Sequence, residues 1–156
     1  MISVPDKKDG EQIHAITTNT SVFSQEEKEC VDELWREYLA QGSERSGYYF
    51  LVDKENDHIL GYTCFGPRSL TSGTYDLYWI AVDSNARRGG VGRRLLAASE
   101  EAIRKLGGRL IVLETSGLPY YKPTRNFYLA TGYTLEATLK DFYKDGDDLI
   151  IFTKRL

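Results

Sequence analysis

The chain has 156 residues, of which 41% are hydrophobic and 28% are charged, and its formal net charge at pH 7 is −3. This length and balance predict one domain, residues 1–156, with a core of its own. The acidic balance argues against a general binder of nucleic acid or of anionic membranes, so any site for an anion must be local.

The sequence lacks signals for a membrane, for secretion and for a metal. No apolar run approaches the roughly 20 residues of a membrane span, and residues 1–10 lack the apolar centre of a secretory signal. Cys30 falls in a helical pattern and Cys64 in a strand pattern, so we expect two reduced thiols rather than a disulfide. His14 and His58 are the only histidines, and no cluster of Cys and His has metal-ligand spacing. We therefore expect a cytoplasmic protein without a metal.

The first half of the chain predicts a strand, a helix and a hairpin. Residues Ile13–Ile16 are compatible with a short strand. Ser24–Glu27 form a capping-box sequence that opens a helix with an apolar period of 3.6, and Gly42 ends this helix. Tyr48–Asp53 and His58–Phe65 are then predicted as the two strands of an antiparallel hairpin.

The second half predicts a parallel crossover followed by another hairpin. Thr74–Val82 carries the strongest strand signal because it is rich in aromatic and β-branched residues. An amphipathic helix follows at about Val91–Leu106, and Leu110–Thr115 is a short strand of the buried type. Two strands joined through a helix in this way lie parallel in one sheet. The other elements are a loop at Gly66–Gly73, a helix at about Thr124–Thr131, and strands at Tyr133–Leu139 and Leu149–Lys154.

Residues Ala86–Leu96, ARRGGVGRRLL, form the connection between the strand and the helix of this crossover. Such a junction places unpaired backbone N–H groups at the positive end of the helix dipole. Gly89, Gly90 and Gly92 let an anion approach the backbone closely. Four arginines can add charge-assisted contacts: Arg87, Arg88, Arg93 and Arg94. The pattern predicts a phosphate site.

Other interpretations of this loop fit less well. A Walker A loop needs Gly-Lys-Ser/Thr, whereas Gly92 is followed by Arg93 and Arg94. A dinucleotide fingerprint needs a third glycine where this chain has Leu95, although Glu114 lies at about the right distance for a ribose contact. A solvated surface turn would leave the cost of three glycines without a use.

A third pattern of phosphate loop fits best. Ile80–Val82 leads into the loop, and the motif Arg87-x-x-Gly90-x-Gly92 precedes a helix that continues with Leu95. This arrangement resembles the acetyl-CoA loop of the GNAT superfamily of N-acetyltransferases. The resemblance implies acetyl-CoA as the cofactor.

The resemblance extends from about Tyr48 to Leu156. Phe127–Tyr133 resembles the family's aromatic segment at the second cofactor helix. Lys140–Tyr143 and Asp147–Ile151 are similar to the end of the GNAT enzymes that acetylate protein N-terminal amines. The family usually has two helices before residue 45, where the sequence shows one. The implied fold is mixed α+β: a mostly antiparallel sheet of about six to seven strands with one parallel pair splayed at the cofactor site, and helices on both faces.

The resemblance also implies which residues hold the coenzyme. In the family, the pantetheine arm bonds along the strand that corresponds to Thr74–Val82, and the pyrophosphate sits on backbone N–H groups that correspond to Arg88–Arg93. Tyr121 stands where the family often has an asparagine that contacts pantetheine. The implied cofactor-binding residues are Ile80, Ala81, Val82, Arg87, Arg88, Gly89, Gly90, Val91, Gly92, Arg93, Tyr121 and Tyr128.

Three residues are the implied catalytic groups. Tyr128 matches the family's general acid, and a phenol with a pKa of about 10 can protonate a departing thiolate. Glu114 matches the glutamate base of the N-terminal-amine enzymes, and Asp76 lies where histone-type enzymes carry their base. Each has a structural alternative: Tyr128 as packing beside Phe127, Glu114 as a partner of Arg125, and Asp76 as a polar strand position.

The acceptor is expected to be an amine. The protein is expected to be a monomer or homodimer that binds neither nucleic acid nor membrane. The loops that flank the splay carry aromatic and acidic residues at Leu118–Lys122 and Asp141–Asp148, which suit a cationic amine. A small amine, a peptide N-terminus and a lysine side chain all fit this pattern. The alternative function is a sensor that binds acetyl-CoA without turnover.

Overall fold

The structure, a computed structural model, describes all residues from 1 to 156. Its helices and strands are, in chain order, β1 (Ile2–Ser3), α1 (Gly10–Asn19), α2 (Gln25–Ser46), β2 (Tyr49–Glu55), β3 (His58–Pro67), β4 (Thr74–Val82), α3 (Val91–Lys105), β5 (Leu110–Ser116), α4 (Lys122–Ala130), β6 (Thr134–Lys144) and β7 (Asp147–Arg155). Short 3₁₀ turns lie at Lys7–Asp9 (η1), Ser84–Ala86 (η2) and Pro119–Tyr121 (η3). No helix is both long and apolar enough to cross a membrane.

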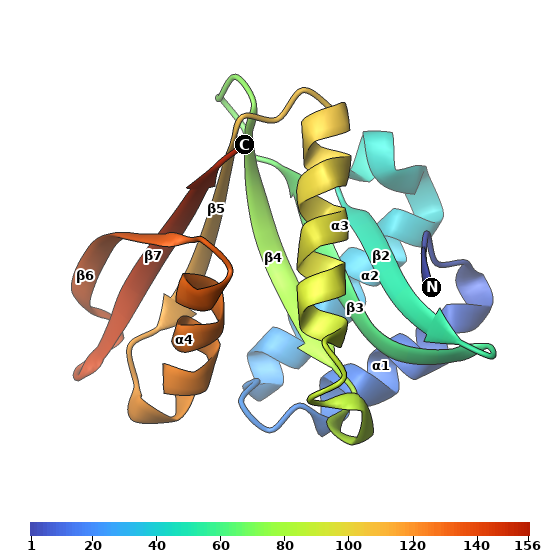
Figure 1. The fold of residues 1–156 in the computed structure, drawn as a ribbon, viewed down its shortest axis with the longest axis horizontal. Coiled ribbons are helices and arrows are strands. Elements are labelled where there is room, and N and C mark those ends of the chain that lie inside the picture. The colour runs from blue at the N-terminus through green and yellow to red at the C-terminus, as the bar shows by residue number, and fades with distance from the viewer.

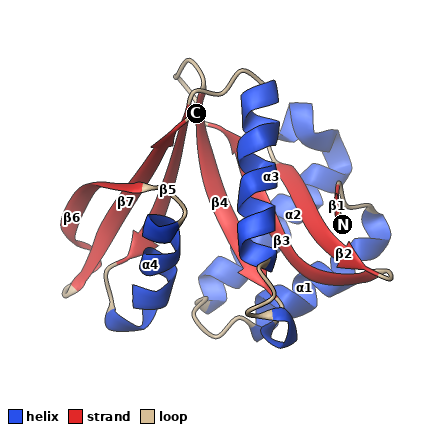
Figure 2. Cartoon of the chain, viewed as in Figure 1, coloured by secondary structure: helices blue, strands red, loops and turns tan.

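Seven strands form one sheet in the order β1-β2-β3-β4-β5-β7-β6 (Figure 1). The β4–β5 pair is parallel, and every other neighbouring pair is antiparallel. Helices α3 and α4 lie on one face of the sheet, and α1 and α2 lie on the other (Figure 2). This is the mixed α+β architecture that the sequence predicted.

Two buried clusters hold the helices to the sheet. The first, which includes Trp35, Phe50 and Tyr62, joins α1 and α2 to β2 and β3. The second, which includes Ile103 and Phe152, joins α3 to the strands from β4 to β7. Each fully buried large apolar side chain contributes about 1.5–3 kcal/mol, so both faces of the sheet are firmly covered.

The predicted strand at Ile13–Ile16 is wrong, because these residues lie inside helix α1. A capping box between Asp6 and Asp9 starts the helical turn ahead of it. Ile13, Ile16 and Thr17 then share one face and are buried, which is the i, i+3, i+4 spacing of an amphipathic helix. Four residues are too few to separate a strand from a helix by periodicity. Both N-terminal helices of the family are therefore present.

The other predicted elements are confirmed with shifted ends. Ser24 and Glu27 form the predicted capping box of α2. Gly42 does break the helical backbone, and a further helical turn then continues to Ser46. The first hairpin turns at Asn56 and Asp57, both with positive φ (48° and 63°), as a two-residue type I′ turn requires.

Strands β4 and β5 diverge after a short paired segment, and the opening between them is called the splay below. They pair only from Thr74 with Leu110 to Asp76 with Val112. Beyond this point β5 pairs with β7 and β4 pairs with β3, and the two strands diverge in Figure 1. The edge of β4 that faces β5 consequently has unpaired backbone groups over its C-terminal half.

A β-bulge accompanies this divergence. Cys64 pairs with Trp79 and Phe65 with Leu77, which leaves Tyr78 as the extra residue of β4. Tyr78 and Trp79 both pack against the cluster on the α1–α2 face. The bulge thus places two consecutive aromatic side chains on one face of the sheet, where a regular strand would alternate them.

Candidate active site

The loop between β4 and α3 presents a row of backbone donors. Its first helical hydrogen bond runs from the Arg94 amide to the Gly90 carbonyl at 3.0 Å. The amides of residues 90–93 precede that bond and have no acceptor within the helix. Arg88 and Gly90 both have positive φ (79° and 71°), a turn conformation that lets successive N–H groups converge on an anion.

The arginines of this loop fall into two kinds. Arg87, Arg88 and Arg93 are exposed and form no ion pair, so they are available to an anion. Arg94 instead bonds to the Asp53 carboxylate and to the Gly89 carbonyl. The first turn of α3 holds cations and no acidic residue, which the helix dipole disfavours until an anion binds there.

The space beside this loop fits an elongated phosphate ligand. A cavity of about 310 Å³ lies between α3 and α4, within the range of small-molecule sites. Arg93 lines it near the loop, and Glu100 and Lys154, which pair at 2.8 Å, line its far side. A Cβ added at Gly92 would lie 3.4 Å from the Phe127 ring, an ordinary van der Waals contact, which shows that the start of α3 lies next to α4. The loop and the cavity meet at Arg93, an arrangement that suits the phosphate groups of coenzyme A.

The two predicted carboxylates lie on the opposite face, joined by Arg68. The Arg68 Nε lies 2.9 Å and 3.0 Å from the Asp76 oxygens, and Nη2 lies 2.7 Å from Oδ1. The same Nη2 lies 3.4 Å from Oε1 of Glu114. The Asp76 side chain is 13% exposed and that of Glu114 is 42% exposed. Asp76 is therefore fully engaged, whereas Glu114 keeps its Oε2 free.

The alternative pairing of Glu114 with Arg125 is not formed. Arg125 Nη1 donates to the carbonyls of Ser116 and Leu118 at 2.8 Å and 2.9 Å. These bonds fix the long connection between β5 and α4. Arg125 is thus a brace for that loop.

Tyr128 lies in the core below the splay. It projects from α4, is 7% exposed, and packs against the rings of Phe127, Tyr133 and Phe152. Its hydroxyl forms no hydrogen bond within the protein, and it is not sealed from solvent as the Tyr133 hydroxyl is. Burial raises the pKa of Tyr128 above its usual value, so the phenol stays protonated at neutral pH.

Tyrosines surround the carboxylates. Burial and then the charge of Asp76 raise the pKa of Tyr78 to about 12. Burial and then the charges of Glu114, Glu27 and Asp147 raise the pKa of Tyr143 to about 12. Acidic side chains of β5, α2 and β7 thus act on Tyr143 of β6, whereas Tyr78 responds to Asp76 of its own strand.

Tyr121 bridges two distant segments. Its hydroxyl donates to the Val22 carbonyl at 2.7 Å, which ties η3 to the connection between α1 and α2. Its role as a pantetheine contact stays a prediction.

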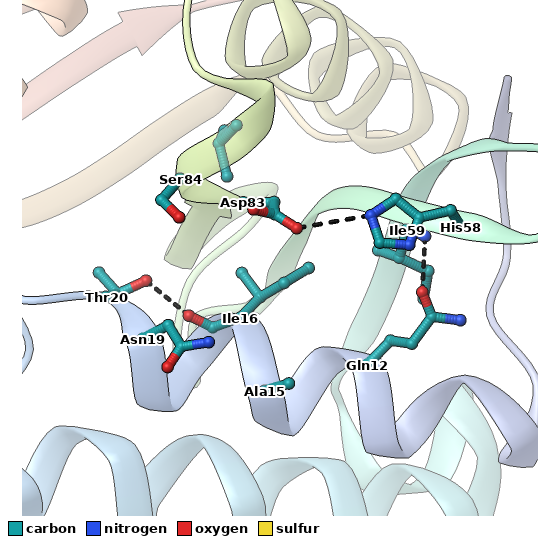
Figure 3. Close-up of a pocket in the computed structure, with 10 residues that line it drawn as sticks. Gln12, Ala15, Ile16, Asn19, Thr20, His58, Ile59, Asp83 and Ser84 are labelled. Atoms are coloured by element: carbon teal, nitrogen blue, oxygen red, sulfur yellow. Dashed lines mark hydrogen bonds and ion pairs between the residues drawn. The ribbon is translucent and has the colours of Figure 1, made fainter.

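A second, smaller pocket lies at the end of β4 on the α1 side (Figure 3). It has a volume of about 80 Å³. Some of its polar groups are paired: His58 lies 3.5 Å from Asp83, and Gln12 accepts from the Ile59 amide at 2.8 Å. The pocket is too small to hold the predicted ligand.

Sequence reasoning missed Arg68 and Tyr78. Arg68 could have been found from the antiparallel pairing of the strands around Gly66–Gly73, because a residue just past the end of one strand lies near the start of the next. Tyr78 had no such signal, because a bulge depends on the register of two strands.

The comparisons with known proteins agree with this geometry. The model of the Acetyltransferase (GNAT) family matches residues 12–133. The chain belongs to the GNAT family. A GNAT-family structure from Desulfovibrio desulfuricans is 40% identical, with a TM-score of 0.94, over 99% of both chains.

More distant GNAT structures share the fold. The ribosomal-protein-alanine N-acetyltransferase of Brucella melitensis is 24% identical, with a TM-score of 0.78, over 100% of this chain and 99% of that chain. A Salmonella typhimurium structure with its cofactor acetyl-CoA is 20% identical, with a TM-score of 0.77, over 100% and 93%. At these identities the likeness establishes the fold alone. None of the curated proteins matches the chain.

Proposed function

We propose that residues 1–156 act as one acetyltransferase domain that moves the acetyl group of acetyl-CoA to a primary amine. The observation that carries the proposal is the position of two features on either side of one splay. The unpaired amides of residues 90–93 lie beside the free edge of β4 on one face. Glu114, with a free carboxylate oxygen, lies on the other.

The coenzyme would be held mainly by backbone. The amides of residues 90–93 would bind the pyrophosphate, and Arg87, Arg88 and Arg93 would add charge. The edge of β4 at Ile80–Val82 would bond to the pantetheine arm, since no strand pairs with that edge. The Salmonella typhimurium structure with acetyl-CoA supports this choice of ligand, because it has the same fold.

When bound, acetyl-CoA supplies a thioester whose C–S bond is exchanged for a C–N bond to the amine. An alkylamine with a pKa of about 10.4 is mostly protonated at neutral pH, so a base must first take its proton. Glu114 would do so through a water at its free oxygen. Asp76 is a poorer base, because Arg68 occupies both of its oxygens.

Tyr128 would supply the other proton. Its hydroxyl, free of protein partners, would donate to the departing sulfur as the C–S bond breaks. Burial keeps the phenol protonated at neutral pH, so the acid is ready to donate. An ammonium group loses two protons when its nitrogen becomes that of an amide. Glu114 and its water would take these in turn, before the attack and as the C–N bond forms, and Tyr128 would give one proton to the sulfur. One of the two protons then restores Tyr128 and the other leaves to solvent.

The acceptor is proposed to be a cationic amine. Glu114 and Tyr143 combine acidic and aromatic character on the face opposite the coenzyme loop, since the charge of Glu114 contributes to the raised pKa of Tyr143, and such side chains favour ammonium groups. Small amines, peptide N-termini and lysine side chains share this group. The Brucella melitensis relative, whose name specifies an alanine of a ribosomal protein, makes peptide N-termini the first acceptors to test.

The test measures thiol release from acetyl-CoA with a panel of amines and peptides. Wild-type protein is expected to release thiol faster with at least one acceptor, and Tyr128→Phe to lose about a hundredfold in kcat while binding coenzyme A normally. Tyr133→Phe is the matched control, because its ring contacts Tyr128 but its hydroxyl is sealed. Binding of coenzyme A without acceleration by any acceptor would favour the non-catalytic sensor instead.

A further inference from the structure

Arg94 makes a three-point contact that joins the coenzyme loop to the opposite edge region of the sheet. Its Nε and Nη2 lie 2.8 Å and 2.7 Å from Oδ2 of Asp53 on β2. Its Nη1 lies 2.7 Å from the carbonyl oxygen of Gly89. The Asp53 side chain is 2% exposed, so the anchor of this contact is buried.

We propose that Arg94 is a positioning residue that sets the coenzyme loop, with Asp53 as its anchor; the proposal rests on the coenzyme site proposed above. A trans peptide holds its C=O and the following N–H in opposite directions. When Arg94 fixes the Gly89 carbonyl, it also fixes the Gly90 amide, which then faces away from Arg94. That amide is the first of the unpaired donors in residues 90–93.

The positive charge of Arg94 does not by itself explain why its side chain contacts both Asp53 and Gly89. The Arg94 guanidinium is hydrogen-bonded to Asp53 and Gly89. The side chains of Arg87, Arg88 and Arg93 form no ion pair beside the same loop. A guanidinium fork can bond to a carboxylate with one edge and to a carbonyl with its remaining nitrogen, which a single ammonium cannot do with the same geometry. Arg94 therefore orders the loop rather than binding the anion.

Titration calorimetry with coenzyme A tests the proposal in wild type, Arg94→Lys and Arg94→Met. Arg94→Lys keeps a cation beside buried Asp53, so the protein stays folded while the fork is lost. We expect about tenfold weaker binding of coenzyme A in both variants, as the loss of an oriented charge-assisted contact implies. Arg104→Met is the control, because Arg104 lies on the same helix in an exposed pair with Glu101.

Binding of pantetheine, which lacks phosphates, distinguishes a loss of phosphate binding at the loop from a general loss of ligand binding in the variants. Both Arg94 variants are expected to bind pantetheine as wild type does. Wild-type affinity for coenzyme A in Arg94→Lys would overturn the proposal, as would an equal loss of affinity for both ligands. If the wild-type protein itself binds no coenzyme A, the proposed function is wrong. That result differs from one in which the wild type binds coenzyme A and only the role of Arg94 is disproved.

Discussion

The coenzyme loop and the acceptor face are built in different ways. The loop takes its donors from one short stretch, residues 90–93, and it is held by one buried anchor, Asp53, whose side chain is 2% exposed. The acceptor face brings Arg68, Glu114 and Tyr143 together from three separate elements, and its Glu114 is 42% exposed. Only the Asp53 end of the Arg94–Asp53 pair is buried, since Arg94 is 49% exposed, whereas Arg68 and Glu114 are 45% and 42% exposed. Salt should therefore screen the Arg68–Glu114 pair more strongly.

The coenzyme loop is thus a fixed part of the site, whereas the acceptor face is a part whose side chains can differ with the substrate. A pyrophosphate needs the same donors whatever the acceptor, so a preorganised loop suits it. An amine needs a wall whose charge and shape can vary with the substrate. Specificity is accordingly expected on the side of Arg68 and Tyr143, and coenzyme affinity on the side of Arg94.

The largest expected effect is that of Glu114→Gln. Removing the proposed base should lower kcat/KM by about a hundredfold, while the Kd for coenzyme A stays unchanged because the loop is on the other face. Asp76→Asn is the comparison, and we expect a much smaller loss because Arg68 already occupies that carboxylate. Steady-state kinetics that show the greater loss in Asp76→Asn would reverse the assignment of the base.

The anchor of the loop should make the fold sensitive to acid. Burial acts to raise the pKa of Asp53, but hydrogen bonds from the Met1 ammonium and Arg94 outweigh it, so the pKa lies below its ordinary value of 3.8. A depressed pKa stabilises the fold above the ordinary value, and the contribution is lost as the pH falls through the folded pKa.

Asp53→Asn should therefore lower the free energy of unfolding at pH 7 by about 2 kcal/mol. Its loss of stability below pH 4 should also be shallower than that of wild type, because one ionisable carboxylate is missing. Urea denaturation between pH 3 and pH 7 measures both effects. Parallel curves for the two proteins would show that Asp53 does not carry this acid sensitivity.

Gly90→Ala should damage the coenzyme loop through its backbone. With a φ of 71° at this position, a Cβ costs about 1–2 kcal/mol, and relaxation of that strain would misalign the donors. Gly107→Ala is the matched control, because Gly107 has a φ of 84°, has open space around it and lies beyond the C-terminal end of α3, away from the loop. We expect both variants to lose stability in thermal melts and only Gly90→Ala to lose affinity for coenzyme A.

The smallest effect is expected at the rim of the acceptor face. Tyr121→Phe removes the hydroxyl that binds the Val22 carbonyl at 2.7 Å, which should cost about 1 kcal/mol of unfolding free energy. It should also change the KM for the amine more than the KM for acetyl-CoA. An effect confined to the KM for acetyl-CoA would instead place Tyr121 against the pantetheine arm.

The sequence predicts most strands and the helices α2, α3 and α4, because their apolar periodicity and the signals at their ends lie in consecutive residues. Helix α1 could not be predicted from Ile13–Ile16, because four residues do not define a period. The capping box at Asp6 and Asp9 belongs to the preceding turn η1, and α1 itself has no side-chain cap. The parallel β4–β5 pair followed from a handedness and length rule that needs no side-chain detail.

The sequence by itself determined the family resemblance and the anion loop, because glycines, arginines and a helix start within one stretch act locally through the backbone. Only the tertiary structure decided which groups are free to act there. It showed that Arg94 is bound to Asp53, that Arg68 holds Asp76, and that Glu114 keeps an open oxygen. The physical reason is that charge pairing and burial depend on distances between residues far apart in the chain, and folding alone sets those distances.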